Sequence, residues 1–102
     1  MTTAVTSTLS RDNRVLKICV SGRFDFHLRD SFSASYNKVS DSVREVSLDF
    51  QHLGYMDSSA LGMLLYMNIY FCEQVEVTIN NCRPMIKELL LLARFDKKFI
   101  VN

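Results

Sequence analysis

The sequence predicts an α/β protein with a mixed β-sheet and three helices packed on it, in the order β-β-α-β-α-β-α-β. Short runs of alternating apolar and polar residues, typical of strands, are interleaved with stretches whose apolar residues recur at helical spacing. Apolar residues make up 48% of the 102 residues, with only three Gly and one Pro, which favours a compact globule over disorder. This length allows one core but not two, so residues 1–102 are expected to form a single domain. That element order favours helices packed on a mixed sheet.

The first part of the chain is expected to form a β-hairpin followed by a helix. Residues 3–20 fit the hairpin, because a turn sequence at 12–13 precedes a β-branched apolar run that ends at Ser21 and Gly22. Residues 24–27 are expected to form a loop with two aromatic side chains. Apolar residues then recur every three to four positions, which predicts a helix over 28–41.

The second part predicts three strands and two helices. Strict alternation indicates strands over 46–50 and 75–79, and the apolar residues at 99–101 indicate a short last strand. Pro84 fits the first position of a helix, where its missing N–H costs nothing. This helix is expected to bury Met85, Ile86, Leu89, Leu90 and Ala93.

Between these strands, residues 58–72 form a charge-free apolar run of helical length. Helical spacing places Leu61, Leu64, Leu65 and Cys72 on the face toward the sheet. It places Met63, Tyr66, Met67 and Tyr70 largely on the opposite face. A helix that is apolar on both faces must be covered twice, so neighbouring helices or a partner must cover this second face. Asn68 falls on the inward side and needs a polar partner.

Charge and hydropathy exclude several classes of protein. Twelve Lys+Arg against eleven Asp+Glu give a formal net charge of +1, without the basic face that nucleic-acid binding requires. The longest apolar run is well short of the ~20 residues needed to span a bilayer, and the N-terminus does not have the pattern of a signal peptide. We therefore expect no nucleic-acid binding, no membrane insertion and a cytoplasmic location. Cys19, Cys72 and Cys82 are expected to be reduced thiols, two of them packed as small hydrophobes.

The sequence does not favour an enzyme, a metal site or a cofactor. A serine nucleophile needs a base and an oxyanion hole, but His27 and His52 are the only histidines and the G-x-S-x-G elbow is absent. Two distant histidines and three scattered cysteines match no metal-ligand spacing. There is no Gly-rich phosphate cradle with its lysine. We expect no catalytic residues.

Residues 55–62 carry the strongest functional signal. Asp57 and Ser58 are both good N-caps at the junction between a strand and a helix, and Ala60 and Gly62 leave the first turn open to another surface. The unpaired N–H groups and the positive dipole end of a helix accommodate an added anion. Ser58 could therefore carry a phosphate. The same pattern is also a common capping arrangement without any modification.

This segment, together with residues 20–25, 46–50, 84–90 and 95–97, resembles STAS domains of the anti-sigma factor antagonist type across nearly the whole chain. The resemblance implies a single STAS-like domain that switches partners. The first serine after the aspartate is the phosphoacceptor in such proteins, which implies Ser58, with Ser59 as the fallback. Asp57 would position the Ser58 hydroxyl and repel the phosphate.

The implied partners are an anti-sigma factor or serine protein kinase, which binds the unphosphorylated form, and a serine phosphatase that restores it. The surface expected to contact the partner consists of Asp25, Met56, Asp57, Ser58, Ser59, Ala60, Gly62, Met63 and Tyr66. The protein is expected to be a monomer or weak dimer. Nucleotide binding, reported for some STAS domains, stays conceivable. The main alternative is a constitutive scaffold that binds a partner without phosphorylation.

Overall fold

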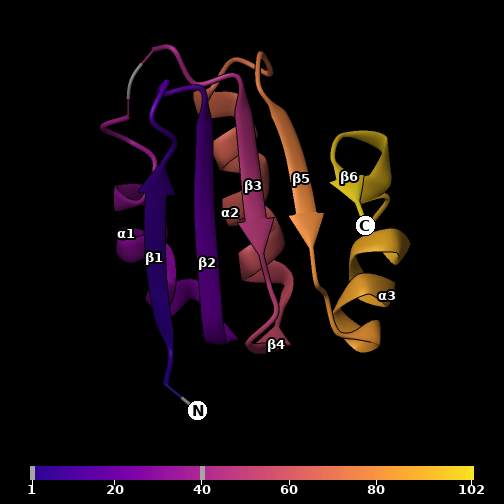
Figure 1. Ribbon diagram of the computed structural model, residues 1–102. Coiled ribbons are helices and arrows are strands. Elements are labelled where there is room, and N and C mark those ends of the chain that lie inside the picture. The colour runs from indigo at the N-terminus through magenta and orange to yellow at the C-terminus, as the bar shows by residue number, and fades with distance from the viewer. Residues whose placement is uncertain (1, 40) are drawn as a thin grey trace.

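The computed structural model describes residues 2–39 and 41–102, which form a mixed sheet with helices on one face (Figure 1). The described strands are β1 (Ala4–Leu9), β2 (Val15–Phe24), β3 (Glu45–Asp49), β4 (Leu53–Met56), β5 (Glu76–Asn80) and β6 (Ile100–Val101). The described helices are α1 (Arg29–Ala34), α2 (Ser58–Tyr70) and α3 (Pro84–Leu92), with short 3-10 helices η1 (Phe26–Leu28) and η2 (Phe95–Lys97). The predicted α/β class, mixed sheet and three helices are confirmed.

The sheet has the strand order β1-β2-β3-β5-β6. β1 runs antiparallel to β2, as the hairpin prediction required, and all other pairings are parallel. Alternate residues of β2, namely Leu16, Ile18 and Val20, are buried in the core. Helices α1 and α2 lie behind the sheet in Figure 1, and α3 lies beside β5.

Strand β4 was not predicted from the sequence. It pairs in parallel with the last part of β2, which continues to Phe24 instead of ending at Gly22 as predicted. β3 pairs with the first part of β2, so β3 and β4 lie one after the other along the same edge of that long strand. β4 has four residues and contains a glycine, which is too short for a recognisable alternation.

The first helix is much shorter than predicted. α1 ends at Ala34, where the Ser35 hydroxyl donates a hydrogen bond to the Phe32 carbonyl, and the chain continues as turns. Tyr36 is nevertheless buried, and its ring contacts those of Phe32, Tyr70 and Phe71. The apolar spacing therefore predicted buried residues correctly, although some of them, such as Tyr36, lie in turns and not in the helix. Ser40, within the predicted helix, lies outside the described residues.

The inward face of α2 differs from the prediction. The buried residues are Ala60, Leu64, Met67 and Asn68, whereas Leu65 is 37% exposed and Cys72 is also exposed. Nearly every residue of this helix is apolar, so the pattern could not orient it. In α3, Ile86 and Leu90 are buried, but Met85 and the C-cap residue Ala93 are exposed, contrary to the predicted stripe.

Asn68 has the polar partner that its inward position requires. Its amide donates a hydrogen bond to Glu73 Oε1 over 3.3 Å, and Lys98 Nζ lies 3.1 Å from the same oxygen. These contacts connect the end of α2 to the segment before β6. The buried amide is thus satisfied within the fold.

The three cysteines are free thiols. Cys19 and Cys82 are half-buried, and Cys82 packs against the core, where burial raises the pKa of its thiol. Cys72 is exposed. Across the described residues, no helix is both long and apolar enough to cross a bilayer.

Candidate functional site

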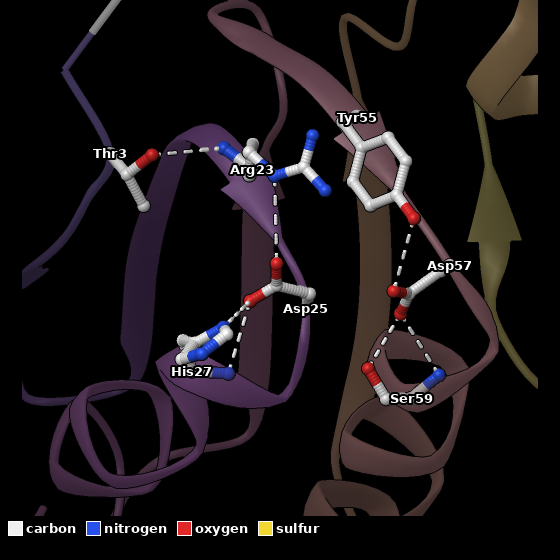
Figure 2. Close-up of polar contacts among 7 residues, drawn as sticks. All are labelled: Thr3, Arg23, Asp25, His27, Tyr55, Asp57 and Ser59. Atoms are coloured by element: carbon white, nitrogen blue, oxygen red, sulfur yellow. Dashed lines mark hydrogen bonds and ion pairs between the residues drawn. The ribbon is translucent and has the colours of Figure 1, made fainter.

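Asp57 is the N-cap of α2 and joins three groups at the start of the helix. Its Oδ1 accepts hydrogen bonds from the Ser59 amide at 3.1 Å and from the Ser59 hydroxyl at 2.5 Å. The Tyr55 hydroxyl donates to Oδ2 at 3.3 Å. The Ser59 hydroxyl, more than any other partner, holds the pKa of the Asp57 carboxyl below its usual value. Asp57 is therefore a charged cap (Figure 2).

The two serines at the start of α2 have different surroundings. Ser58 is exposed, and among the described residues its hydroxyl has no hydrogen-bond partner. Ser59 is half-buried, and its hydroxyl is bonded to the cap. The family resemblance implied that Asp57 positions the Ser58 hydroxyl, but in this geometry the carboxylate holds Ser59 instead.

A bend in β2 brings a second loop to the site. β2 changes its register with β4 between Gly22 and Arg23, and Gly22 has a φ of +80°. A Cβ there would lie 2.6 Å from the Thr3 Cα, so only glycine fits. Beyond the bend, Arg23 lies opposite Tyr55 and Phe24 opposite Met56. The segment that follows β2 therefore lies beside the segment that leads into α2.

Asp25 caps η1 in the way that Asp57 caps α2. Its Oδ1 accepts a hydrogen bond from the His27 amide at 3.0 Å and lies 3.1 Å from His27 Nδ1. Arg23 Nε lies 3.6 Å from Asp25 Oδ2. Partial burial raises the pKa of the Asp25 carboxyl, but the hydrogen bonds from His27 and the charge of Arg23 outweigh it, and the pKa lies below its usual value.

Arg23 and Tyr55 connect the two capped loops. The Arg23 guanidinium carbon lies 3.8 Å from the centroid of the Tyr55 ring, a cation–π contact. Figure 2 shows Arg23 between Asp25 on one side and Tyr55 on the other. The Tyr55 hydroxyl in turn contacts Asp57. A chain of side chains thus runs from η1 to the cap of α2.

A groove of about 680 Å³ lies beside the cap, between α1 and α2. Its lining includes Ser59, Gly62, Met63 and Tyr66 from α2 and its start. The other side is Phe26, Arg29, Asp30, Phe32, Ser33 and Tyr36. Phe26 and Tyr66 are 64% and 63% exposed, which leaves two large aromatic side chains available for contact.

Of the residues expected to contact a partner, Ser59, Gly62, Met63 and Tyr66 line this groove, and Asp25, Asp57 and Ser58 belong to the two capped segments. The other two lie elsewhere. Met56 and Ala60 are 8% and 0% exposed, so both belong to the core and are corrected here. A Cβ at Gly62 would meet no atom within 4 Å, as the expected open first turn requires.

Sequence reasoning missed the role of Arg23 and the contribution of α1 to the groove. The two aromatic residues in 24–27 were the one available signal for Phe26. Neither the bend in β2 nor the register with β4 could be predicted from the sequence. The position of Arg23 beside Tyr55 could therefore not be predicted either.

The two histidines make separate contacts within the fold. His27 is bonded to Asp25, and His52 contributes its carbonyl to the Gly22 amide. Throughout 2–39 and 41–102, no group of three or more His, Cys, Asp or Glu side chains lies close enough to hold a metal ion.

The structure combines a mixed sheet, helices on one face and a capped serine pair at the start of α2. The chain belongs to the STAS domain family, whose model matches residues 7–102. It is 33% identical over 100 residues to a STAS-domain containing protein of Pseudomonas aeruginosa (strain UCBPP-PA14), covering 97% of this chain and 99% of that protein.

Solved structures share the fold. An anti-sigma factor antagonist from Mycobacterium paratuberculosis matches with a TM-score of 0.73 and 19% identity, over 96% of this chain and 85% of that one. The unphosphorylated form of the anti-sigma factor antagonist SpoIIAA matches with a TM-score of 0.69 and 18% identity, over 97% and 87%. The chain therefore has the fold of anti-sigma factor antagonists.

Proposed function

We propose that this STAS domain is a phosphorylation-controlled protein-binding module whose acceptor is Ser58. The observation that carries the proposal is the difference between the two serines. The Ser58 hydroxyl is exposed and has no hydrogen-bond partner among the described residues, whereas Asp57 holds the hydroxyl of Ser59. A kinase can therefore reach Ser58 without breaking the cap of α2. Ser59 is the fallback acceptor, but its phosphorylation would break the hydrogen bond between its hydroxyl and Asp57.

The position of Ser58 suits a phosphate electrostatically. It is the first residue of α2, where free N–H groups and the helix dipole favour an anion. The adjacent Asp57 carboxylate is charged and opposes the phosphate. The fold can thus tolerate the modification, while the local charge of the surface changes strongly.

The unphosphorylated surface is suited to docking. Gly62, Met63, Tyr66 and Phe26 form an open, largely apolar area beside Ser58. We propose that a partner covers this area together with Asp25, Asp57, Ser58 and Ser59. An anti-sigma factor or serine protein kinase is the proposed partner, and a serine phosphatase would restore the binding form. The supporting likeness is to SpoIIAA, which has been solved in both an unphosphorylated and a phosphorylated form.

One phosphate is large enough to act as the switch. It adds about −1.5 to −2 charges at neutral pH. Burying such a charge without a partner at an interface costs about 2–5 kcal/mol. That range corresponds to a loss of roughly 30- to several thousand-fold in affinity.

The test compares partner binding by single variants. Ser58→Asp should lose the partner that Ser58→Ala and the native protein retain in a pull-down from the native host, followed by an affinity measurement on the purified partner. Gln74→Glu is the matched control, because it adds one negative charge on an exposed residue beyond the other end of α2. Equal binding by Ser58→Asp and Ser58→Ala would support the constitutive scaffold instead.

A further inference from the structure

We propose that Arg23 is the residue that pairs with the phosphate on Ser58. The inference rests on the proposed function, since it concerns the phosphorylated form. Arg23 would act as a positioning residue. Its side chain would leave Asp25 and Tyr55 and pair with the phosphate.

The backbone places Arg23 beside the site. The bend at Gly22 puts Arg23 directly opposite Tyr55 in the β2–β4 pair, three residues before Ser58. The Arg23 amide donates to Thr3 Oγ1 at 3.2 Å, which holds the backbone while the side chain points away. The Arg23 side chain is 61% exposed and is free to reorient.

The Arg23 guanidinium is connected to the cap residue Asp57 through the ring of Tyr55. It rests 3.8 Å from the Tyr55 ring centroid, and the hydroxyl of that ring lies 3.3 Å from Asp57 Oδ2. Ser58 is the next residue along the chain. A phosphate on its exposed hydroxyl would therefore be carried by the residue directly after Asp57, where the contact chain that starts at Arg23 ends. Figure 2 shows that contact chain from Arg23 through Tyr55 to Asp57.

The present contacts of Arg23 hold it weakly. Its Nε lies 3.6 Å from Asp25, longer than a good charge-assisted hydrogen bond, and its contact with Tyr55 is at the surface. Asp25 keeps two hydrogen-bond contacts with His27 when Arg23 leaves. A phosphate offers a guanidinium a bidentate pair, the strongest arrangement available to it. The exchange therefore leaves the Asp25 carboxylate, whose side chain is 14% exposed, with its contacts to His27.

Arg29 is the rival cation. It lines the groove with Ser59, its side chain is 78% exposed, and its Nε lies 3.8 Å from Asp30. Arg29 does not contact the side chains that lead to the cap, whereas Arg23 does through Tyr55. The geometry therefore favours Arg23, and the experiment must distinguish the two.

The experiment measures the pKa of the phosphate itself. Phosphoserine is placed at position 58 by genetic code expansion, and the second phosphate pKa is followed by ³¹P NMR. A nearby guanidinium stabilises the dianion, so this pKa should be lower with Arg23 than with Arg23→Gln, by about half a unit to one unit at an exposed site. Arg23→Lys should restore part of the shift, because it keeps the charge but not the bidentate fork.

Two controls identify the source of the shift. Arg29→Gln should leave the phosphate pKa unchanged. His27→Gln should keep the Arg23-dependent shift, which excludes the imidazole beside Asp25 as its source. Asp25, Asp57 and Tyr55, the other titratable groups of the contact chain, are present in every sample.

An identical phosphate pKa in the native protein and Arg23→Gln, or a shift that follows Arg29 instead, would overturn the assignment. A thermal melt of each variant verifies that it is folded. Because the phosphate is installed directly, the result does not depend on a kinase. Failure of the proposed function would show separately, as unchanged partner binding by the phosphoserine protein.

Discussion

A single carboxylate makes two neighbouring serines chemically different. Asp57 accepts hydrogen bonds from both the amide and the hydroxyl of Ser59, and this leaves the Ser58 side chain at the surface. The distinction depends on the extended backbone of Asp57, which aims its side chain at the second residue of the helix. The proposed acceptor and a structural serine thus stand side by side.

Removing the cap should destabilise the protein without removing the proposed acceptor. We expect Asp57→Ala to lower the free energy of unfolding by about 1 kcal/mol at neutral pH, the usual worth of an N-cap. Asp57→Asn should keep most of the stability, because asparagine caps equally well. Chemical denaturation of the three proteins measures both values.

The effect of Asp57 on stability should depend on pH. The hydrogen bond from the Ser59 hydroxyl lowers the pKa of this carboxyl in the folded state relative to the unfolded one. The ionised group therefore stabilises the fold above a pH of about 4, and this contribution is lost as the pH falls through the folded-state pKa. The difference between native protein and Asp57→Ala should shrink from pH 5 toward pH 3. A constant difference across this range would contradict the charged cap.

At the scale of single residues, the sequence predicted where the capped helix begins, but not the hydrogen bonds that its capping residue makes. It indicated both Asp57 and Ser58 as good N-caps at a helix start, because capping residues have strong and local preferences, and the structure has Asp57 in that position. It could not tell which serine Asp57 would bind, since both lie within reach of the same carboxylate. Met56 and Ala60 were wrongly assigned to the surface because burial depends on the sheet behind them.

Among the elements, α2 carries the site on one side and the core on the other. Its buried residues follow the spacing 60, 64, 67 and 68, and Asn68 is tied to Glu73 at the far end. The side with Gly62, Met63 and Tyr66 faces the groove. The orientation of this helix therefore decides which side chains a partner can meet.

A pair of adjacent leucines tests this orientation. Leu64 is 0% exposed and Leu65 is 37% exposed, although the sequence predicted both to face the sheet. Leu64→Ala should lower the free energy of unfolding by about 2–5 kcal/mol, because it leaves a cavity in the core. Leu65→Ala should lower it by about 1 kcal/mol or less. Equal losses in urea denaturation would mean that the helix is rotated from the position described here.

The sequence predicted elements well where a pattern was long or sharply ended. Pro84 marked the start of α3, and alternation marked β3 and β5. It failed where the chain packs without regular structure, as at Tyr36, and where a strand is as short as β4. In both cases tertiary contacts, not local propensity, determine the backbone.

At the scale of the whole molecule, the sheet topology assembles the site. β2 extends past the end of β3 and pairs with β4, which places the 23–28 segment beside the start of α2. Residues about thirty positions apart, Arg23 and Tyr55, then come into contact. Neither the groove nor this contact could be predicted, because both follow from the pairing of two strands and not from any local pattern.

The central claim is that phosphorylation of Ser58 switches this docking surface off. The measurement that tests it most directly is isothermal titration of the purified partner with two forms of the native-sequence protein, unmodified and carrying phosphoserine at position 58. We predict that the phosphate raises the Kd by roughly 30-fold or more, since each 1.4 kcal/mol corresponds to about tenfold. Equal Kd values for the two forms would contradict the account.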